Sequence, residues 1–470
     1  MARLFRYFAI VFALCSVQIA SSVGQERHFK PSTWTEWNKG FAHRFPGKAW
    51  QKFATPEEAG WSSEKIAEVR NLSEAIGSAA VMIVYDGVVL AEWGEVERRF
   101  MCHSMRKSIL SALYGIAVEG GQIDLNESLG ALGIDDDTAL TAEEKTAKIS
   151  DLLKARSGVY LPAAYESKGM KENRPKRGSH KPGSHWYYNN WDFNALATIY
   201  NHKTKGDLFN AFKSQIADPL QMQDFDLRHT YYHLEAHNSR HAAYPFRMSA
   251  RDLARFGLLF LNEGAWNRRQ LFSADWVRES TKAYSWNEEF GNGYGYMWWR
   301  FRGPTVELGT YAAIGHGGQM TIVVPEARLV IIHRSNTYVG KRISNNQIGI
   351  LLRSVLRART SPVRDNPKIV MREQQASKGE GAPPPKAEIE AALGKYRNLR
   401  FQLTVERRPG GLQAYDPTFG RFHLLRSGEN EYFIEDAQYR VRFEGGKGGP
   451  ASGLTITYPH DKPRKMWRVP

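Results

Sequence analysis

The sequence predicts a mixed α/β (α+β) protein in which an antiparallel sheet is flanked by helices, with a helical subdomain and a small all-β domain behind it. Three observations predict this class. Apolar, strand-like runs stand at both ends of the main region, at 79–93 and 320–333. The segment between them, from about 122 to 290, is mainly helical with long loops, and short alternating runs fill 387–470. Strands that enclose a helical segment must come together to share one sheet.

The first elements of the main region have clear signals. Ala79–Tyr85 and Val88–Trp93 are apolar runs joined by Asp86-Gly87, a dipeptide typical of a tight hairpin. Residues 103–119 predict a helix that ends at Gly120-Gly121, because its apolar residues recur at helical spacing. Residues 25–60, which precede these elements, are aromatic and polar and predict an irregular lead-in.

The later elements follow the same rules. Asp252–Leu261 predicts an amphipathic helix, and three segments predict strands: 295–300, 320–325 and 329–333. The polar, Pro-rich stretch 364–386 predicts a linker. Six alternating runs behind it predict a small sandwich or barrel: 401–405, 411–415, 422–425, 432–434, 439–443 and 454–458. The predicted division is therefore a main domain at 25–363, a linker at 364–386 and a β domain at 387–470.

Residues 1–24 predict a signal peptide. Arg3 and Arg6 precede an apolar stretch that is followed by small residues, and Ser22 and Gly24 fit the −3 and −1 positions of a cleavage site. Cleavage after Ser22 is an alternative, and an uncleaved membrane anchor is another, although the apolar run is short for a span of about 20 residues. The sequence thus predicts an exported protein, periplasmic or secreted, with no membrane span after signal removal.

Composition limits the other function classes. The chain of 470 residues carries a net charge of +15, but its basic residues are scattered and no nucleic-acid motif accompanies them, so we expect a solvated basic surface. One denser basic cluster, at 168–181, leads into a motif described below. After signal removal Cys102 is the only cysteine, which excludes an intramolecular disulfide, and we interpret it as a small buried residue.

The first motif that carries chemistry is Ser104-Met105-Arg106-Lys107, a Ser-x-x-Lys sequence at the start of the predicted helix. Residues three apart share a helix face, so the Lys107 amine can reach the Ser104 hydroxyl. A serine is a weak nucleophile until a base removes its proton, and a desolvated lysine can be that base. By itself the motif is weak evidence for catalysis, because the start of any helix with a solvated lysine can have the same Ser-x-x-Lys sequence.

Two further motifs follow in the chain. In Tyr188-Asn189-Asn190 a tyrosine with a pKa lowered by nearby ammonium groups can carry a proton, and the amide can orient a substrate. The register is ambiguous, since Tyr187-Tyr188-Asn189 also fits the pattern. In His316-Gly317-Gly318-Gln319, the glycines let a substrate backbone approach a strand and the imidazole can hold a polar group. An aromatic core patch and a Gly-rich turn are the structural alternatives.

The order Ser-x-x-Lys, Tyr-x-Asn, His-x-Gly resembles the signature of the penicillin-recognising serine hydrolases, across roughly residues 55–360. The sequence looks most like the class C β-lactamase branch, with its related esterases and peptidases. Three flanking features add to the resemblance: Phe193 five residues after Tyr188, the segment 218–222 and the segment 249–256. Phe193 favours Tyr188 over Tyr187. The C-terminal domain resembles the lipocalin-like barrel found behind many such hydrolases.

The resemblance implies a role for each motif. Ser104 would form an acyl-enzyme, Lys107 would be the general base and Tyr188 would relay the proton to the leaving group. Substrate would be bound by Asn190, His316, Gly318 and Gln319, with the oxyanion on the N–H groups of Ser104 and Gln319. Neither a metal nor a cofactor is required, and the partner is a small ester, amide or peptide.

Departures from the pattern limit the substrate. β-Lactamases of this branch carry Lys-Thr-Gly where this chain has His316-Gly317-Gly318, and glycine offers no hydroxyl to a ligand carboxylate. The sequence therefore predicts an esterase or small-amide hydrolase. The alternatives are a D,D-carboxypeptidase or D-aminopeptidase, a β-lactamase, and a non-catalytic penicillin-binding sensor. The oligomeric state is not predicted.

Overall fold

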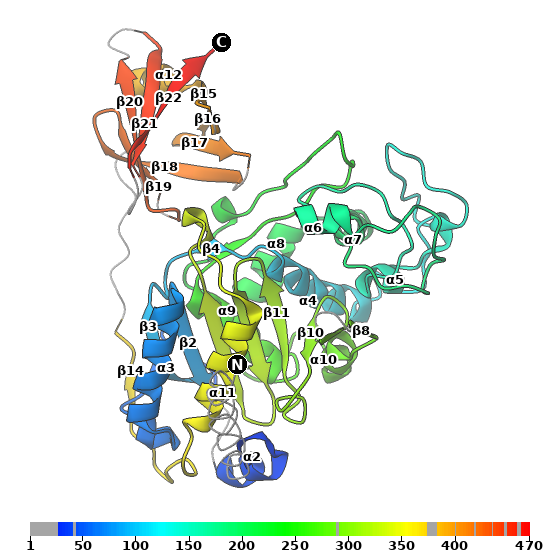
Figure 1. Cartoon of the computed structure of the whole chain (residues 1–470), viewed down its shortest axis with the longest axis vertical. Helices are drawn as coiled ribbons and strands as arrows, with labels where there is room; N and C mark the ends of the chain where they lie inside the picture. Colours follow the sequence, from blue (N-terminus) through cyan, green and yellow to red (C-terminus); the bar gives the residue numbers. More distant parts are fainter. Residues whose placement is uncertain are drawn as a thin grey trace, which may run out of the picture.

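The structure is a computed structural model with two parts: a large sheet covered by helices, and a small barrel beside it (Figure 1). The predicted signal peptide, 1–24, lies outside the described residues. Within the part of the chain that is described, no helix is long and apolar enough to cross a bilayer. The structure describes residues 27–40, 44–287, 291–373, 383–399, 401–417, 420–434, 436–445, 449–457 and 462–470.

The large sheet has ten strands, and its neighbours are antiparallel except for the parallel pair β1 and β3. The segments predicted at the two ends of the main region meet at its centre, where β13 pairs with β2. In spatial order the strands are β14 (Ile369–Met371), β1 (Gln51–Phe53), β3 (Val88–Gly94), β2 (Ala80–Tyr85), β13 (Leu329–Arg334), β12 (Gln319–Val324), β11 (Tyr311–Gly315), β10 (Trp299–Phe301), β9 (Asn292–Tyr294) and β8 (Ser285–Asn287).

The hairpin β2–β3 turns at Asp86 and Gly87, whose φ angles of 44° and 88° are both left-handed. This conformation is the one that two-residue hairpins require. Glycine is needed at the second position for a further reason, since a Cβ on Gly87 would lie 1.9 Å from the Arg44 carbonyl oxygen. The Asp-Gly dipeptide thus allows the turn, and its glycine lets the turn lie against the backbone of the lead-in segment.

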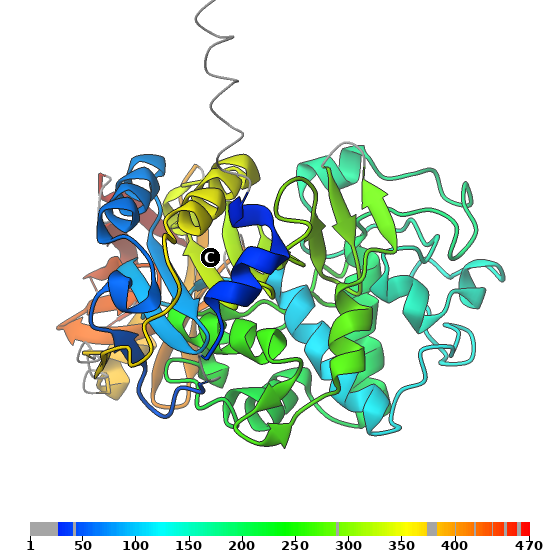
Figure 2. The ribbon, with the colours of Figure 1, turned by 90° about the horizontal axis from the view of Figure 1, so that it is seen from below.

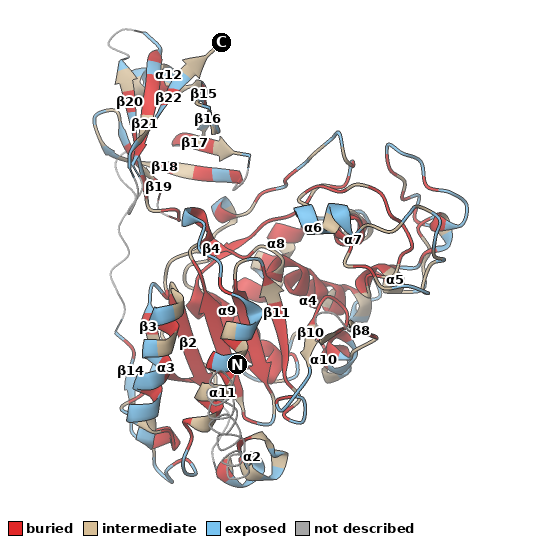
Figure 3. Ribbon diagram, in the orientation of Figure 1, coloured by how far each residue is buried: buried red, intermediate tan, exposed pale blue. Residues whose placement is uncertain are grey.

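Helices cover both faces of the sheet, and strand residues alternate between two cores (Figure 3). Met82 and Val84 of β2 face the core shared with α4 and α9, while Ile83 and Tyr85 face the core shared with α3 and α11. Helices α3 and α11 lie side by side on the second face (Figure 2). This alternation is the period of two expected for a strand that is buried on both sides.

The helices have the following bounds: α2 (Pro31–Trp37), α3 (Ser63–Ile76), α4 (Met105–Glu119), α5 (Ile149–Leu153), α6 (Lys168–Glu172), α7 (Asn190–Thr204), α8 (Leu208–Phe212), α9 (Ala250–Leu261), α10 (Ala274–Thr281), α11 (Asn345–Arg357) and α12 (Lys386–Ala392). Single turns are η2 (Pro56–Ala59), η3 (Glu144–Thr146), η4 (Lys213–Ala217), η5 (Leu227–His229) and η6 (Thr337–Val339). Two short ribbons complete the main domain: β4 (Phe100–Met101) with β5 (Arg247–Met248), and β6 (Ala265–Trp266) with β7 (Arg269–Gln270).

The C-terminal segment forms a closed eight-stranded barrel, and its apolar core continues into buried residues of the main domain. Its strands are β15 (Gly394–Arg397), β16 (Gln402–Arg408), β17 (Gly411–Asp416), β18 (Gly420–Gly428), β19 (Glu431–Ile434), β20 (Tyr439–Gly445), β21 (Ala451–Thr457) and β22 (Arg464–Val469). The barrel contacts the main domain through buried Asp436, which pairs with Arg99 at 2.9 Å and His229 at 2.7 Å. The predicted fold class, a helix-flanked sheet followed by an all-β domain, is confirmed.

Three local differences from the sequence prediction have physical reasons. Residues 295–298 are not part of a strand, because Met297 has a φ of 65° and the chain turns there between β9 and β10. Strand β14 lies inside the segment predicted as a linker, since it adds an edge to the sheet by pairing with β1. The lead-in segment, residues 25–60, contains α2 and β1, although its apolar residues do not recur at a clear helix or strand spacing.

Candidate active site

The candidate nucleophile stands at the junction of strand β4 and helix α4. His103 has a left-handed φ of 50°, and Ser104 follows it as the N-cap of α4. The next three amides are occupied, because Met105, Arg106 and Lys107 donate to the carbonyl oxygens of residues 102, 103 and 104. Ser104 is half-buried at this turn, and the three amides after it already have partners within the turn and the helix.

Lys107 lies one turn further along α4 and reaches both candidate proton carriers. Its Nζ donates to Ser104 Oγ at 3.2 Å and to the Tyr188 hydroxyl at 2.6 Å. The side chain is 1% exposed, and Nζ sits over the ring of Phe193 at 4.4 Å. Burial, and secondly the charge of Arg106, hold the pKa of Lys107 well below its usual range. Both causes favour the unprotonated amine, which is the form that can accept a proton.

Tyr188 and Tyr187, the two tyrosines of the ambiguous register, point to different places. Tyr187 donates its hydroxyl to the Met170 carbonyl at 2.6 Å, away from Lys107. The expectation of a lowered tyrosine pKa is wrong: burial raises the pKa of Tyr188 to about 12, opposed by hydrogen bonding to Ser104 and by Arg106. The physical reason is burial, which disfavours the charged phenolate and is the largest cause of the shift.

Asn190 is the first residue of α7 and projects toward the loop that carries Tyr165. Its Nδ2 donates to the Tyr165 carbonyl at 2.6 Å, and its Oδ1 is buried with no partner in the described structure. The preceding Asn189 caps the helix and donates to Asp192 at 2.8 Å. Burial raises the pKa of Asp192 well above its usual range. These bonds fix the backbone that presents Tyr188 and Asn190.

His316, Gly317 and Gly318 form the turn of the hairpin β11–β12, directly before β12, as expected for a segment that precedes the apolar strands. Gly318 has a φ of 93°, and a Cβ there would come within 2.9 Å of the Ile343 carbonyl oxygen. Gln319 is buried and donates from Nε2 to the Ser335 carbonyl at 2.7 Å. Its side-chain amide is therefore held within the fold.

Sequence reasoning missed His103, the residue before the nucleophile. Its Nε2 lies 2.9 Å from Thr337 Oγ1 and its Nδ1 lies 3.3 Å from the Tyr165 hydroxyl. Its ring meets the His316 ring edge-on at 5.5 Å. Burial, and then the neighbouring His316, lower the pKa of His103 to about 3, so the imidazole is neutral. Adjacency to Ser104 was the one signal in the sequence that could have found it.

An aromatic cluster lines the Lys107 side of the site. Tyr188 packs against Phe193, Tyr294 and Trp299, with ring centroids 5.2, 5.8 and 5.4 Å apart. These rings come from α7, β9 and β10, so three separate segments exclude water from the lysine. Desolvation of this kind favours the unprotonated amine of Lys107.

The basic cluster of 168–181 is partly neutralised by its own neighbours. Arg174 pairs with Glu166 at 2.6 Å and Arg177 with Glu144 at 2.7 Å. These guanidinium groups are committed to carboxylates of the helical subdomain. This is consistent with a structural role for much of the cluster.

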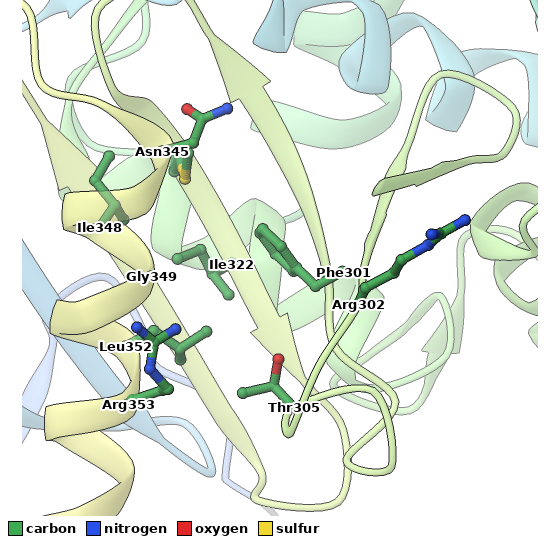
Figure 4. A pocket seen from close by; sticks show the side chains of 10 residues that line it. Phe301, Arg302, Thr305, Ile322, Asn345, Ile348, Gly349, Leu352 and Arg353 are labelled. Atoms are coloured by element: carbon green, nitrogen blue, oxygen red, sulfur yellow. The ribbon is translucent and has the colours of Figure 1, made fainter. Parts of the chain in front are cut away.

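A separate small pocket lies between α11 and the strands β10 and β12 (Figure 4). Its wall is mostly apolar, with Arg302 and Arg353 at the rim. None of the candidate site residues lines it. It is therefore distinct from the Ser104 site.

The comparison with known families identifies the fold of the main domain as that of the serine β-lactamases and penicillin-binding-protein-like hydrolases. Residues 64–350 match the model of the Beta-lactamase family, and the chain belongs to this family. Membership makes it a hydrolase of the β-lactamase fold. A search of curated proteins gives no match.

Solved structures that are similar to this chain include the following three. A protein assigned as a 6-aminohexanoate-dimer hydrolase from Bacillus anthracis is 18% identical, with 68% of this chain and 92% of that chain covered and a TM-score of 0.48. A penicillin-binding protein homologue from Caulobacter crescentus is 13% identical, with coverages of 64% and 99% and a TM-score of 0.48. An octameric homologue from Pyrococcus abyssi is 13% identical, with coverages of 86% and 99% and a TM-score of 0.45.

Proposed function

We propose that the protein hydrolyses esters or small amides through an acyl-enzyme on Ser104. One observation carries this proposal: the buried Lys107 amine is within hydrogen-bond distance of both Ser104 and Tyr188. A base that contacts the nucleophile on one side and a second hydroxyl on the other can take a proton and pass it on.

The proposed acylation step proceeds as follows. Ser104 Oγ attacks the carbonyl carbon, and its proton passes to Lys107. The oxyanion accepts hydrogen bonds from the amides of Ser104 and Gln319, which is worth on the order of a hundredfold in rate per donor. The leaving group departs with a proton from Tyr188, which takes one in turn from Lys107. Water then attacks the carbonyl carbon of the acyl group on Ser104. The acyl group leaves as the carboxylic acid, and Ser104 recovers a proton from the water.

Tyr188 acts in this scheme as a neutral phenol. With a pKa of about 12 it keeps its proton at neutral pH and donates it only when Lys107 supplies another. The relay therefore starts from a neutral lysine and a neutral phenol, and no unpaired charge has to be created before the substrate binds.

The hairpin turn supports a substrate without a strongly bound carboxylate. Burial, and secondly Arg342, lower the pKa of His316, so the imidazole is neutral at physiological pH. Gly317 and Gly318 offer backbone groups alone. We therefore favour a neutral ester or amide over a β-lactam, with Asn190 and His316 orienting it.

The test compares a short-chain p-nitrophenyl ester with a chromogenic cephalosporin, using residues 25–470. We expect ester turnover that is lost in Ser104→Ala and retained in Ser111→Ala. Ser111 is a matched control: it is buried on the same helix, and its hydroxyl has no partner within the described structure. Ester turnover that survives in Ser104→Ala would remove Ser104 from the mechanism.

Two other results would change the substrate class. Faster cephalosporin than ester turnover would make the protein a β-lactamase. If neither compound reacts but D-amino-acid peptides are cleaved, the peptidase alternative replaces the esterase. A single burst without turnover would mark a sensor that acylates and stops.

We also propose that the protein is exported, on the strength of residues 1–24 alone. Expression of the full chain should give a mature protein outside the cytoplasm that begins at Gln25, or at Val23 if cleavage follows Ser22. N-terminal sequencing distinguishes the two. An uncleaved chain in the membrane fraction would instead support the anchor.

A further inference from the structure

The short turn η6 lies between the barrel and the Ser104 site, and the barrel holds its middle residue, Tyr338. Tyr439, the first residue of β20, donates its hydroxyl to the Tyr338 carbonyl at 2.7 Å. The ring of Tyr338 packs against that of Phe422 on β18, with centroids 5.8 Å apart. All three side chains are buried. The barrel therefore contacts both the backbone and the side chain of η6.

The first residue of η6, Thr337, contacts the candidate active site in two places. Its Oγ1 lies 2.9 Å from Nε2 of His103, the residue before Ser104. Its methyl group lies against the hairpin turn, because a Cβ on Gly317 would come within 2.5 Å of Thr337 Cγ2. One buried threonine thus contacts the nucleophile turn and the β11–β12 hairpin at the same time.

Neither η6 nor His103 is held in place by its own backbone. Turn η6 spans only three residues and is closed by the Gly340 N–H, which donates to the Thr337 carbonyl at 3.1 Å. A single turn of this kind has little stability by itself. The φ of His103 is 50°, a left-handed value that a histidine keeps only where the surrounding structure requires it. Contacts from outside therefore decide where both stand.

We propose that Tyr439 of the barrel is a positioning residue for the nucleophile. Its bond to the Tyr338 carbonyl sets the place of Thr337, and Thr337 holds His103, and with it the turn that carries Ser104. The inference rests on the proposed role of Ser104. Tyr439 acts through η6 and need not contact the substrate. The barrel is in this way part of the catalytic unit.

The bond from Tyr439 can be removed without undocking the barrel. The Tyr338 ring has its own anchors, since Arg247 Nε donates to its hydroxyl at 3.2 Å and the Arg247 guanidinium lies 4.1 Å from the centroid of Phe422. Asp436 keeps its pairs with Arg99 and His229. Tyr439→Phe, which retains the ring, should therefore fold with the barrel in place.

The first test is kcat/KM for the p-nitrophenyl ester in the full mature chain. Tyr439→Phe should lower it on the order of tenfold, because a small displacement of the nucleophile costs rate. The matched control is Tyr396→Phe. Tyr396 is also a buried barrel tyrosine whose hydroxyl donates to a backbone carbonyl, that of Ala392 at 2.8 Å, but this carbonyl belongs to α12. The control should retain the kcat/KM of the wild type.

A double-mutant cycle tests the route through η6. Thr337→Val removes the hydroxyl that faces His103 and should by itself lower kcat/KM. If Tyr439 acts through Thr337, the two changes together should lose little more than the worse single change, because residues on one route are not additive. Full activity of Tyr439→Phe, or losses that multiply in the double variant, would overturn the inference while the proposed function stands.

If the wild-type protein does not react with the ester, the proposed substrate class falls, and NMR of histidine labelled with ¹⁵N in the ring answers the same question. The ring signals of His103 are those that disappear in His103→Asn. They should shift in Tyr439→Phe and stay in place in Tyr396→Phe. Unchanged His103 signals in Tyr439→Phe would refute the role of Tyr439.

Discussion

Gly315, the last residue of β11, lies directly against the carbonyl oxygen of Cys102, two residues before the nucleophile. A Cβ at position 315 would come within 2.3 Å of that oxygen and within 3.3 Å of Met105 Cγ. The sheet and the nucleophile turn are therefore in backbone contact at this point. The φ angle of Gly315 is not left-handed, so closeness alone requires the glycine.

Gly315→Ala should displace the turn that holds Ser104. We expect the free energy of unfolding to fall by about 1–3 kcal/mol, which is typical of overpacking. We also expect kcat/KM to fall clearly below that of the Gly169→Ala control. Denaturant unfolding and ester kinetics measure the two effects. Gly169→Ala, at an open position of α6 with nothing within 4 Å, is the control. Full activity in Gly315→Ala would show that the contact does not constrain the nucleophile.

Tyr188→Phe should lower kcat by about a hundredfold or more, because the hydroxyl that contacts Lys107 is lost. Tyr187→Phe removes an equivalent hydroxyl one residue away, where it bonds the Met170 carbonyl and Arg174, away from Lys107. It should retain near-normal kcat. Steady-state ester kinetics compare the pair, and the reverse ranking would mean that the other register is the functional one.

Lys107→Met should abolish turnover and change how stability depends on pH. The native pKa of Lys107 is lowered, whereas the unfolded value stays near 10.5, so the unfolded chain binds more protons between the two. Stability of the wild type therefore rises with pH across that window, by about 1.4 kcal/mol per unit. The variant should lack this contribution in urea unfolding measured from pH 6 to 10. An identical slope would mean that Lys107 is charged in the native state.

His103 should tolerate asparagine better than valine. Its φ of 50° suits Asn, while a β-branched residue pays of order 1–3 kcal/mol in this region. His103→Asn also keeps a polar group toward Thr337. Thermal midpoints and kcat/KM should both rank His103→Asn above His103→Val. Because the pKa of His103 is about 3, the wild-type rate should show no titration of this group between pH 5 and 9.

Asp436→Asn should loosen the barrel from the main domain. Asp436 is buried with Arg99 and His229, and removing one member of such a cluster costs about 3–5 kcal/mol. The contact lies next to β4, which leads to Ser104, so activity should also fall. Limited proteolysis and ester kinetics measure both effects against Glu429→Gln, a change at an exposed barrel residue. Equal protease resistance of the two variants would contradict this role.

The sequence by itself determined the elements that depend on local rules. Asp86-Gly87 specified the hairpin, the apolar spacing after Ser104 specified α4, and the alternating runs after 400 specified most barrel strands. These signals act between residues that are close in the sequence, so these elements can be predicted without knowledge of the fold. Two barrel strands, β15 and β22, were missed because their ends are polar and they are recognised only by pairing with their neighbours, β16 and β21, and with each other.

Tertiary structure alone decided the chemistry of the site. That Tyr188 and not Tyr187 reaches Lys107 depends on how α7 packs against α4, a relation between residues 81 positions apart. The direction of each pKa shift depends on burial, which is why a tyrosine expected to be acidic is held as a neutral phenol.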